Sequence, residues 1–197
     1  MSSVNFTCVG PTKTLAYLRG DLRAASKSFF LIGPWLDAYV AQQIILLAPR
    51  HLHARVLIRA EQQVEAAVWL EILSALSMFA GHWRKFEART LERLHAKCLL
   101  IDEQLAYLGS ANWYRYSLET SIELVLRGPL ESVAGLLQEA EQLWEQASSL
   151  QIPAERGTAR PSAADGITHE VLDPLAAKVL KDNPKAFIFG KKKQRNS

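Results

Sequence analysis

The stretch LHAKCLLIDEQLAYLGSANW, from Leu94 to Trp113, most strongly limits what this chain can be. It spaces six residues in the pattern His-x-Lys-x4-Asp-x6-Gly-Ser-x-Asn. These are His95, Lys97, Asp102, Gly109, Ser110 and Asn112. The run from Leu94 to Ile101 is otherwise apolar and ends in Asp-Glu-Gln, which predicts a buried strand leading into a turn. The run from Leu105 to Trp113 is predicted to be the next strand.

The spacing of the pattern predicts which of its side chains act together. Because side chains alternate between the two faces of a strand, His95 and Lys97 are expected to project to the same side. Asp102 is expected on the other side and is interpreted as a structural turn residue, not as a phosphate ligand. On the second strand, Ser110 and Asn112 share a face, and the preceding glycine allows close backbone approach of a ligand or a neighbouring strand.

These residue types suit attack on a phosphodiester. A buried lysine without a partner is costly, and an oxyanion ligand would remove that cost. A neutral imidazole beside it can attack phosphorus, while Lys97 and the Asn112 amide hold the non-bridging oxygens. The segment SIELVLR, Ser121 to Arg127, is predicted as a further strand. Glu123 within it could accept a hydrogen bond from the second ring nitrogen of His95 and fix its tautomer.

The complete pattern resembles the HKD motif of the phospholipase D superfamily. Glu123 resembles the downstream glutamate of that family, whereas Ser121 stands where many members have asparagine. The resemblance implies an α/β fold with a mixed β-sheet flanked by helices on both faces and one HKD motif per chain. It also implies that His95 forms a phosphohistidine, that a second histidine protonates the leaving oxygen and then activates water, and that no metal or other cofactor is needed.

The motif occurs once in the chain. None of the other histidines is followed two residues later by lysine; these are His51, His53, His82 and His169. Two-motif members of the family build their site from two halves of one chain. A symmetric dimer would supply His95 and Lys97 twice, so we predict a homodimer with one composite site across the two-fold axis. Small one-motif members are typically nucleases, which favours DNA or RNA as substrate.

Predicted helices and strands alternate outside the motif. Helices are expected from Thr12 to Ser26, from Asp37, from Val64 to Ala80, and from Pro129 to about Ser148. Strands are expected from Ser28 to Ile32, from Ala54 to Arg59, and from Trp83 to Ala88. This alternation argues for an α/β catalytic domain over residues 1–150, with a mixed sheet between helical layers.

Four further residues are candidates for contact with substrate. Trp35 and Arg59 lie at the ends of predicted strands, where ligands of open α/β sheets usually bind. Trp113 and Arg115 follow Asn112 closely and could stack on bases or contact phosphates. The alternative for both tryptophans is simple packing in the core. No metal site is predicted.

The last 47 residues differ in composition, and residues 151–197 are predicted to form a linker, a short helix and a basic tail. Lys191, Lys192 and Lys193 could bind phosphate backbones without sequence preference, or the tail could simply be solvated. A partner protein could dock through residues 184–190.

The formal net charge of +3 permits a polyanionic partner without demanding one. No secretory signal and no run of about 18 apolar residues is visible, so we expect a cytoplasmic protein without membrane insertion. Two alternatives to a nuclease stay open. One is a lipid-directed phosphodiesterase of the same superfamily, which predicts an exposed apolar surface. The other is a partner-dependent nucleic-acid-binding module with little activity alone.

Overall fold

The computed structural model describes residues 6–10 and 13–152. The strands are β1 (Thr7–Val9), β2 (Ser28–Gly33), β3 (His53–Arg59), β4 (Lys85–Leu91), β5 (Cys98–Ile101), β6 (Leu105–Gly109), β7 (Val125–Pro129) and β8 (Ser148–Leu150). The α-helices are α1 (Thr14–Ala24), α2 (Ala38–Ile45), α3 (Ala66–His82), α4 (Arg115–Glu119) and α5 (Leu136–Gln146). Short 3-10 turns occur at Glu61–Gln63 and Leu130–Ser132.

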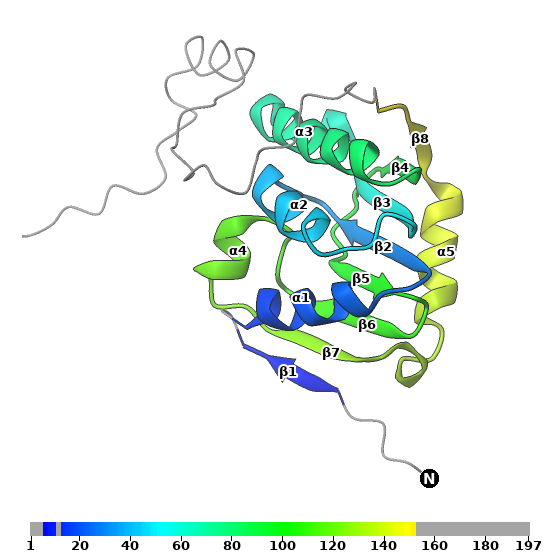
Figure 1. Ribbon diagram of the computed structural model, residues 1–197. Coiled ribbons are helices and arrows are strands. Elements are labelled where there is room, and N and C mark those ends of the chain that lie inside the picture. Colours follow the sequence, from blue (N-terminus) through cyan, green and yellow to red (C-terminus); the bar gives the residue numbers. More distant parts are fainter. Residues whose placement is uncertain (1–5, 11–12, 153–197) are drawn as a thin grey trace, which may run out of the picture. The chain divides into compact units, whose positions relative to one another are not determined.

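All eight strands form one mixed sheet in the order β1-β7-β6-β5-β2-β3-β4-β8 (Figure 1). Strands β2, β3 and β4 are mutually parallel, and every other neighbouring pair is antiparallel. The parallel strands are joined by α2 and α3, because parallel neighbours need a crossover connection. The antiparallel strands β5 and β6, around whose ends the motif residues lie, are joined by a tight turn. The predicted mixed α/β fold is confirmed.

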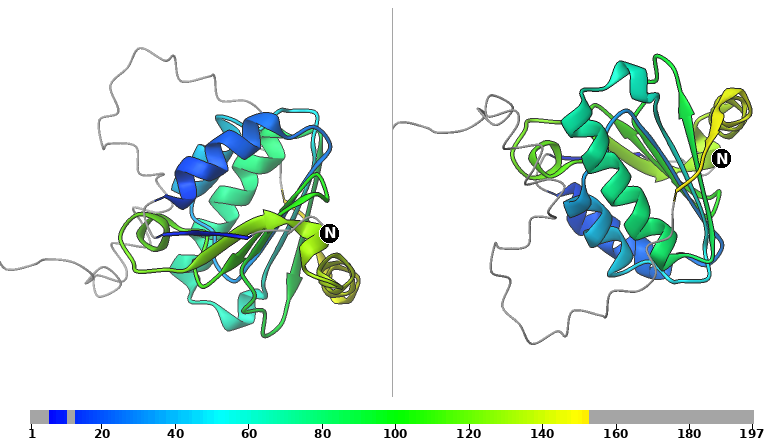
Figure 2. Two further views of the ribbon diagram at one scale, coloured as in Figure 1. Left: turned by 90° about the horizontal axis from the view of Figure 1, so that it is seen from below. Right: turned by 90° about the horizontal axis from the view of Figure 1, so that it is seen from above.

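Helices cover both faces of this sheet, as the fold class predicted. Phe29 and Leu31 of β2 belong to one hydrophobic core, which is completed by α1, α2 and α3. Phe30 and Ile32, whose side chains point to the opposite face, belong to a second core completed by α5. Viewed along the sheet, α1 and α3 lie on one side and α5 on the other (Figure 2). The fully apolar sequence of β2 follows from its burial on both faces.

The strands near the motif are shorter than the sequence predicts. The partner strand β2 pairs Ile32 with Cys98 and ends at Gly33. It is followed by Pro34, which has no N–H to continue a ladder. Strand β5 therefore starts at Cys98, and His95 and Lys97 lie in the segment before it. In the same way, Asn112 follows β6 and Glu123 precedes β7.

Several short elements were not predicted from sequence. They are the edge strands β1 and β8 and the helix α4. The long helix expected directly after Pro129 begins only at Leu136, after a 3-10 turn. By contrast, Asp37 caps α2 as expected, with its Oδ1 accepting a hydrogen bond from the Val40 N–H at 2.8 Å.

The predicted linker, C-terminal helix and basic tail lie outside the described residues, apart from Gln151 and Ile152. The domain boundary at about residue 150 stays a prediction. None of the helices in the described part of the chain has both the length and the apolar character needed to cross a bilayer.

Candidate active site

The topology brings the motif residues to one edge of the sheet. Strands β2, β3 and β6 run in one direction and β5 and β7 in the opposite direction, so the ends of the first three meet the starts of the last two. This edge collects residues that lie far apart in the sequence. They are Trp35 after β2, Arg59 at the end of β3, His95 and Lys97 before β5, Ser110 and Asn112 after β6, and Glu123 before β7.

His95 and Lys97 lie in direct contact at this edge. The Lys97 ammonium nitrogen is 3.0 Å from Nδ1 and 3.1 Å from Nε2 of the His95 ring, and it donates a hydrogen bond to the His95 carbonyl at 2.8 Å. The His95 side chain is exposed, whereas Lys97 is half-buried. The sequence predicted from strand alternation that His95 and Lys97 lie on the same side, and they do. They lie in the segment before β5, however, and not within a strand.

The electrostatics around Lys97 favour an anion. Burial lowers the pKa of Lys97, the nearby positive charge of Arg59 lowers it further, and Glu123 opposes both effects. Arg59 is held in place by a hydrogen bond from its Nε to the Leu94 carbonyl at 2.8 Å. Two cations that partly destabilise each other gain from an oxyanion placed between them, which is what a phosphodiester supplies.

Glu123 is engaged by serine hydroxyls. Ser110 donates a hydrogen bond to one of its carboxylate oxygens at 2.5 Å, and Ser117 donates to the other at 2.7 Å. The backbone of Ser110 is itself fixed, because its N–H donates to the Leu124 carbonyl at 3.0 Å. The hydrogen bond expected between Glu123 and the His95 ring is not formed within the described residues. The carboxylate instead organises the segment that carries Asn112.

Asn112 is held by Ser117, a residue that sequence reasoning missed. The Asn112 backbone N–H donates to the Ser117 hydroxyl at 2.9 Å, and Ser117 is fully buried on α4. The Asn112 side chain is also buried, and its Oδ1 has no hydrogen-bond partner in the described part of the chain. Rotation of the amide exchanges its two ends, so this position can present an N–H donor to a phosphate oxygen. A single serine five residues after Asn112 has no spacing pattern that would reveal its role.

Replacing Ser117 by alanine should reduce turnover by about tenfold and stability by about 1–2 kcal/mol, because it leaves the Asn112 N–H and Glu123 without their shared partner. Steady-state kinetics and urea unfolding measure the two effects. The matched control is Ser132→Ala, since the buried Ser132 hydroxyl makes no hydrogen bond within the described residues. Equal kinetics for the two variants would remove Ser117 from the positioning of Asn112.

Asp102 lies at the other end of β5 and is a structural residue, as interpreted from the sequence. Its carboxylate accepts hydrogen bonds from the backbone N–H groups of Ser26, Lys27 and Ser28 at 2.7, 2.7 and 2.9 Å, and from the Ser26 hydroxyl at 3.0 Å. It thereby ties the β5–β6 turn to the connection between α1 and β2. Asp102 itself adopts a positive φ of 56°, in the left-handed region that Asp tolerates better than most residues.

Gly109 allows the backbones of β6 and β7 to approach closely. A Cβ atom at this position would lie 2.1 Å from the Leu124 carbonyl oxygen, which no side chain can accommodate. The predicted close approach is therefore to a neighbouring strand. It sets the spacing between Ser110 and Glu123.

The four candidate substrate contacts separate into two groups. Trp35 and Arg59 lie beside the motif, with the Trp35 ring 6.3 Å from the His95 ring and 5.6 Å from the Arg59 guanidinium.

Trp113 is buried, and its indole N–H donates to the Ile32 carbonyl at 2.9 Å, so its ring packs in the core and is not available to a base. Arg115 donates to Glu119 at 3.0 Å and packs over the Tyr39 ring. Its positive charge is therefore already paired with a carboxylate on α4. Lys191, Lys192 and Lys193 lie outside the described residues.

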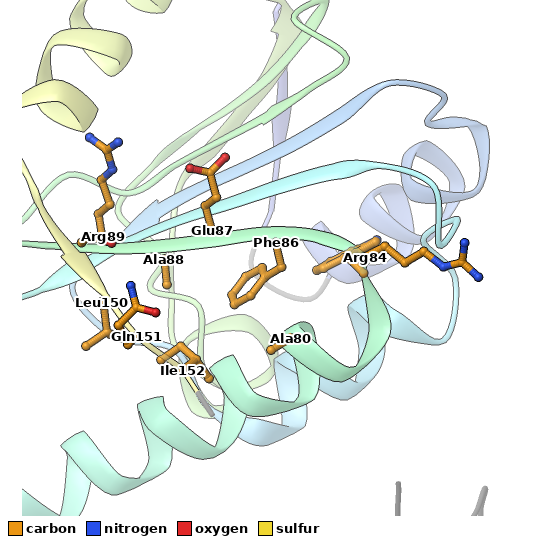
Figure 3. Close-up of a pocket in the computed structure, with 11 residues that line it drawn as sticks. Ala80, Arg84, Phe86, Glu87, Ala88, Arg89, Leu150, Gln151 and Ile152 are labelled. Carbon is orange, nitrogen blue, oxygen red and sulfur yellow. The ribbon is translucent and has the colours of Figure 1, made fainter. Parts of the chain in front are cut away.

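A separate hollow of about 260 Å³ lies near the edge of the sheet that ends in β8, away from the motif, between α3, β4 and β8 (Figure 3). Phe86, Arg89 and Leu150 are among the residues that line it. None of the predicted site residues contributes to this hollow. Lys97 and Gly109 line a much smaller depression beside Trp113, so the motif lies at an open edge and not in a deep pocket.

Comparison with known proteins identifies related sequences and folds. Residues 18–144 match the family model described as cardiolipin synthase, PLD-like domain. No curated protein matches the chain in sequence.

Among solved structures, NucT from Helicobacter pylori shares 16% identity with a TM-score of 0.60, and the match covers 75% of this chain and all of that one. The phospholipase D family member Nuc from Salmonella typhimurium shares 13% identity with a TM-score of 0.61, covering 76% and 98%. Phosphatidylserine synthase from Haemophilus influenzae shares 12% identity with a TM-score of 0.58, covering 76% and 41%.

Proposed function

Because this chain belongs to the phospholipase D superfamily, as a PLD-like domain over residues 18–144, we propose that it is a metal-independent endonuclease that cleaves DNA or RNA. The observation that carries the proposal is the contact between the exposed His95 ring and the half-buried Lys97, with Arg59 close by. This arrangement supports the proposal, because the imidazole proposed as the nucleophile lies beside two cations that can hold a phosphate.

In the proposed reaction, a ring nitrogen of His95 attacks phosphorus and forms a P–N bond while the bond to the leaving oxygen breaks. Lys97 and Asn112 hold the non-bridging oxygens as charge builds up on them. The leaving oxygen takes a proton from an acid. The deprotonated form of that acid then takes a proton from water, whose oxygen attacks phosphorus while the P–N bond breaks and the free ring is restored. His95 is occupied throughout as the nucleophile, so a second copy of the chain provides the acid through its own His95. The active form is thus proposed to be a homodimer.

Nucleic acid is the favoured substrate for two reasons. The match covers 100% and 98% of two short structural relatives, which fits a compact one-motif organisation, whereas it covers 41% of phosphatidylserine synthase. The groups beside the motif, Arg59 and Trp35, suit a phosphate and a base respectively. Lys191, Lys192 and Lys193 are proposed to add contacts to the backbone of the polymer, and residues 184–190 to offer a site for a partner protein.

A lipid-directed phosphodiesterase is the second candidate, and one observation favours it. Ile122 and Leu124, on either side of Glu123, have exposed side chains, which is the kind of apolar surface that a lipid-directed member would need. The substrate assay therefore includes phospholipid.

The deciding experiment is a cleavage assay in excess EDTA with wild-type protein. The substrates are single-stranded DNA, double-stranded DNA, RNA and vesicles of phosphatidylglycerol and phosphatidylcholine. We expect cleavage of at least one nucleic acid and no release of lipid headgroup. Headgroup release without nucleic-acid cleavage would establish the lipid candidate instead, and activity that EDTA abolishes would exclude the metal-independent mechanism.

A further inference from the structure

Four basic residues lie at the edge of the sheet opposite the motif. Lys27 stands directly before β2, Arg50 lies in the connection from α2 to β3, and Arg84 and Lys85 stand at the start of β4. All four residues are exposed. We call Lys27, Arg50, Arg84 and Lys85 the basic row. Since β2, β3 and β4 are parallel neighbours, their starts lie side by side, and α4, next to the motif, lies at the other end of these strands (Figure 1).

The backbone connects the two lysines of the row across β3. The His53 N–H at the start of β3 donates a hydrogen bond to the Lys27 carbonyl at 3.0 Å. In the ladder between β3 and β4, His53 pairs with Lys85. Neighbouring strands are about 4.8 Å apart, so the backbones of Lys27 and Lys85 lie about 10 Å apart, one on either side of β3.

The two arginines of the row are brought together by Trp83. The buried Trp83 stands directly before Arg84, and its indole N–H donates a hydrogen bond at 2.9 Å to the carbonyl of Pro49, directly before Arg50. Burial lowers the pKa of His82 at the end of α3, and the positive charge of Arg50 lowers it further, although a backbone hydrogen bond opposes both. The charge of Arg50 therefore lies close to the end of α3, beside Arg84.

No partner within the described residues neutralises the row, because none of its side chains forms an ion pair there. The carboxylates of Asp102 and Glu87 bond to other groups, Asp102 to backbone N–H groups at the start of β2 and Glu87 to the His53 ring at 2.7 Å. Helices α1, α2 and α3 end at this edge, and the partial negative charge of helix C-termini favours cations. That effect leaves the ammonium and guanidinium donors of the row available to an anion.

The sign of the charge changes along this edge of the sheet. Glu103 in the β5–β6 turn and Glu131 after β7 are exposed, so the positive charge is confined to the starts of β2, β3 and β4. The row is thus a short positive line and not a uniformly positive face. Its length of about 10 Å matches about three successive phosphates of a duplex strand, which follow one another every 3.4 Å or so along the helix axis.

We infer that the basic row is a second contact surface for nucleic acid, which holds the sugar-phosphate backbone of a segment away from the bond being cleaved. This inference rests on the proposed function, which makes nucleic acid the substrate. Backbone contacts of this kind add affinity without reading sequence. The row would therefore favour long polymers over short ones, whatever their sequence.

The length of β3 separates the row from the chemistry. This strand runs for seven residues from His53 at the edge of the row to Arg59 beside the motif, a distance of about 20 Å. One phosphate cannot contact both places, so the row acts on a different part of the polymer from the part that His95 attacks. We therefore expect the row to determine the KM for a long substrate and to leave kcat unchanged.

An anionic membrane would also be attracted to the row, but the surroundings favour nucleic acid. Surfaces that lie on bilayers add apolar side chains to their cations. Among the large apolar side chains that are exposed in the described part of the chain, Leu46 alone lies in a connection at this edge, and the others lie on α1, on α4, on β7 or just before β7. One leucine supplies little of the apolar area that a bilayer requires.

The first test compares two double variants with the same change of charge. Arg50→Gln with Lys85→Gln removes half of the row, and Lys13→Gln with Arg19→Gln removes one lysine and one arginine from exposed positions at the start of α1 and within it. Both are made in full-length protein that also carries His95→Ala, so that the polymer stays intact. Fluorescence anisotropy with 40-nucleotide single strands and 40-base-pair duplexes measures the Kd at several salt concentrations.

We expect the row variant to bind the polymer about tenfold more weakly and the slope of log Kd against log salt to fall by about one to two, because two phosphate contacts are lost. The control should bind as the parent protein does. In protein that retains His95, the row variant should show the same rise in KM with an unchanged kcat. Equal losses in row variant and control, or a loss confined to kcat, would overturn the inference.

A second test needs no change in the row. Acetylation of lysine amines, followed by mass spectrometry, is compared with and without saturating 40-nucleotide polymer in the His95→Ala protein. We expect bound polymer to slow acetylation of Lys27 and Lys85 and to leave Lys13 unaffected. Unchanged rates at Lys27 and Lys85 in the presence of bound polymer would exclude the row from the interface.

The outcomes separate this inference from the proposed function. If the polymer binds through the row but wild-type protein cleaves none in excess EDTA, the contact surface stands and the proposed activity fails. If wild-type protein cleaves the polymer while row variant and control behave alike, the activity stands and the inference fails. Binding to phosphatidylglycerol vesicles that the row variant loses, with polymer binding unchanged, would assign the row to a membrane and overturn the inference.

Discussion

Replacing His95 by alanine is expected to lower the rate of phosphodiester cleavage by at least about 10⁴-fold, since the loss is that of the nucleophile itself. The His95 ring is exposed, and Lys97 is its sole side-chain hydrogen-bond partner among the described residues. Folding should therefore be unchanged. Cleavage in excess EDTA, with thermal unfolding measured on the same sample, tests both parts of this expectation.

The control for His95→Ala is His51→Ala, which removes another exposed imidazole. His51 lies just before β3, at the end of that strand opposite Arg59, and its ring bonds to the Ser26 carbonyl. We expect this variant to cleave at the wild-type rate. Full activity in His95→Ala would exclude His95 as the nucleophile, and loss of activity in both variants would point to a general effect of losing a histidine.

Replacing Asp102 by alanine is expected to lower the free energy of unfolding by about 2–4 kcal/mol. The substitution removes the acceptor for three backbone N–H groups and one hydroxyl, and bonds to a charged acceptor are the stronger class. Urea unfolding measures the change. Because Asp102 and His95 lie at opposite ends of β5, the protein that remains folded should still cleave its substrate.

Glu103→Ala is a close control for Asp102→Ala. Glu103 is exposed and has a φ of 55°, nearly the same as the 56° of Asp102, so an alanine is equally strained at either position. The difference between the two variants reports mainly the hydrogen bonds of the Asp102 carboxylate, with a smaller part from the greater tolerance of Asp for the left-handed region. Equal stability losses would show that backbone conformation, and not those bonds, determines the effect of the substitution.

The same carboxylate predicts a dependence of stability on pH. Burial alone would raise the pKa of Asp102, but the hydrogen bonds from Ser28, Lys27 and Ser26 outweigh it and lower the pKa below the ordinary value of 3.8. The ionised form is thus favoured in the folded protein. Its contribution is complete above that ordinary value and is lost as pH falls through the lower pKa of the folded state. In acid, the stability difference between wild type and Asp102→Ala should accordingly shrink.

Much of the candidate site could be predicted because its signals are local. The spacing of His95 and Lys97 specifies that their side chains lie together whether the segment is a strand or an extended connection. Asp102 could be recognised as structural because it ends an apolar run at a turn. The partners of Glu123 could not be predicted, since Ser117 lies on a short helix whose position depends on contacts such as the one between Asp37 and Arg115.

The burial of Trp113 illustrates the same limit. Tryptophan after a motif strand can face a ligand or the core, and its neighbours in sequence do not distinguish the two. The structure decides it through Gly33, where a Cβ atom would lie 2.4 Å from the Trp113 ring. Space for that ring exists only because a glycine 80 positions earlier lies opposite it.

The sequence by itself determined the α/β fold, the family and the identity of the motif residues, because hydrophobic periodicity and fixed spacing act within a short length of chain. The tertiary structure decided where the strands stop, which residues hold Glu123, and that Leu124 and Leu126 stay exposed. Alternating leucines look the same on every half-buried strand. Whether Leu124 and Leu126 are covered depends on how far α5 extends over the sheet, and the order of the strands places β7 beyond its reach.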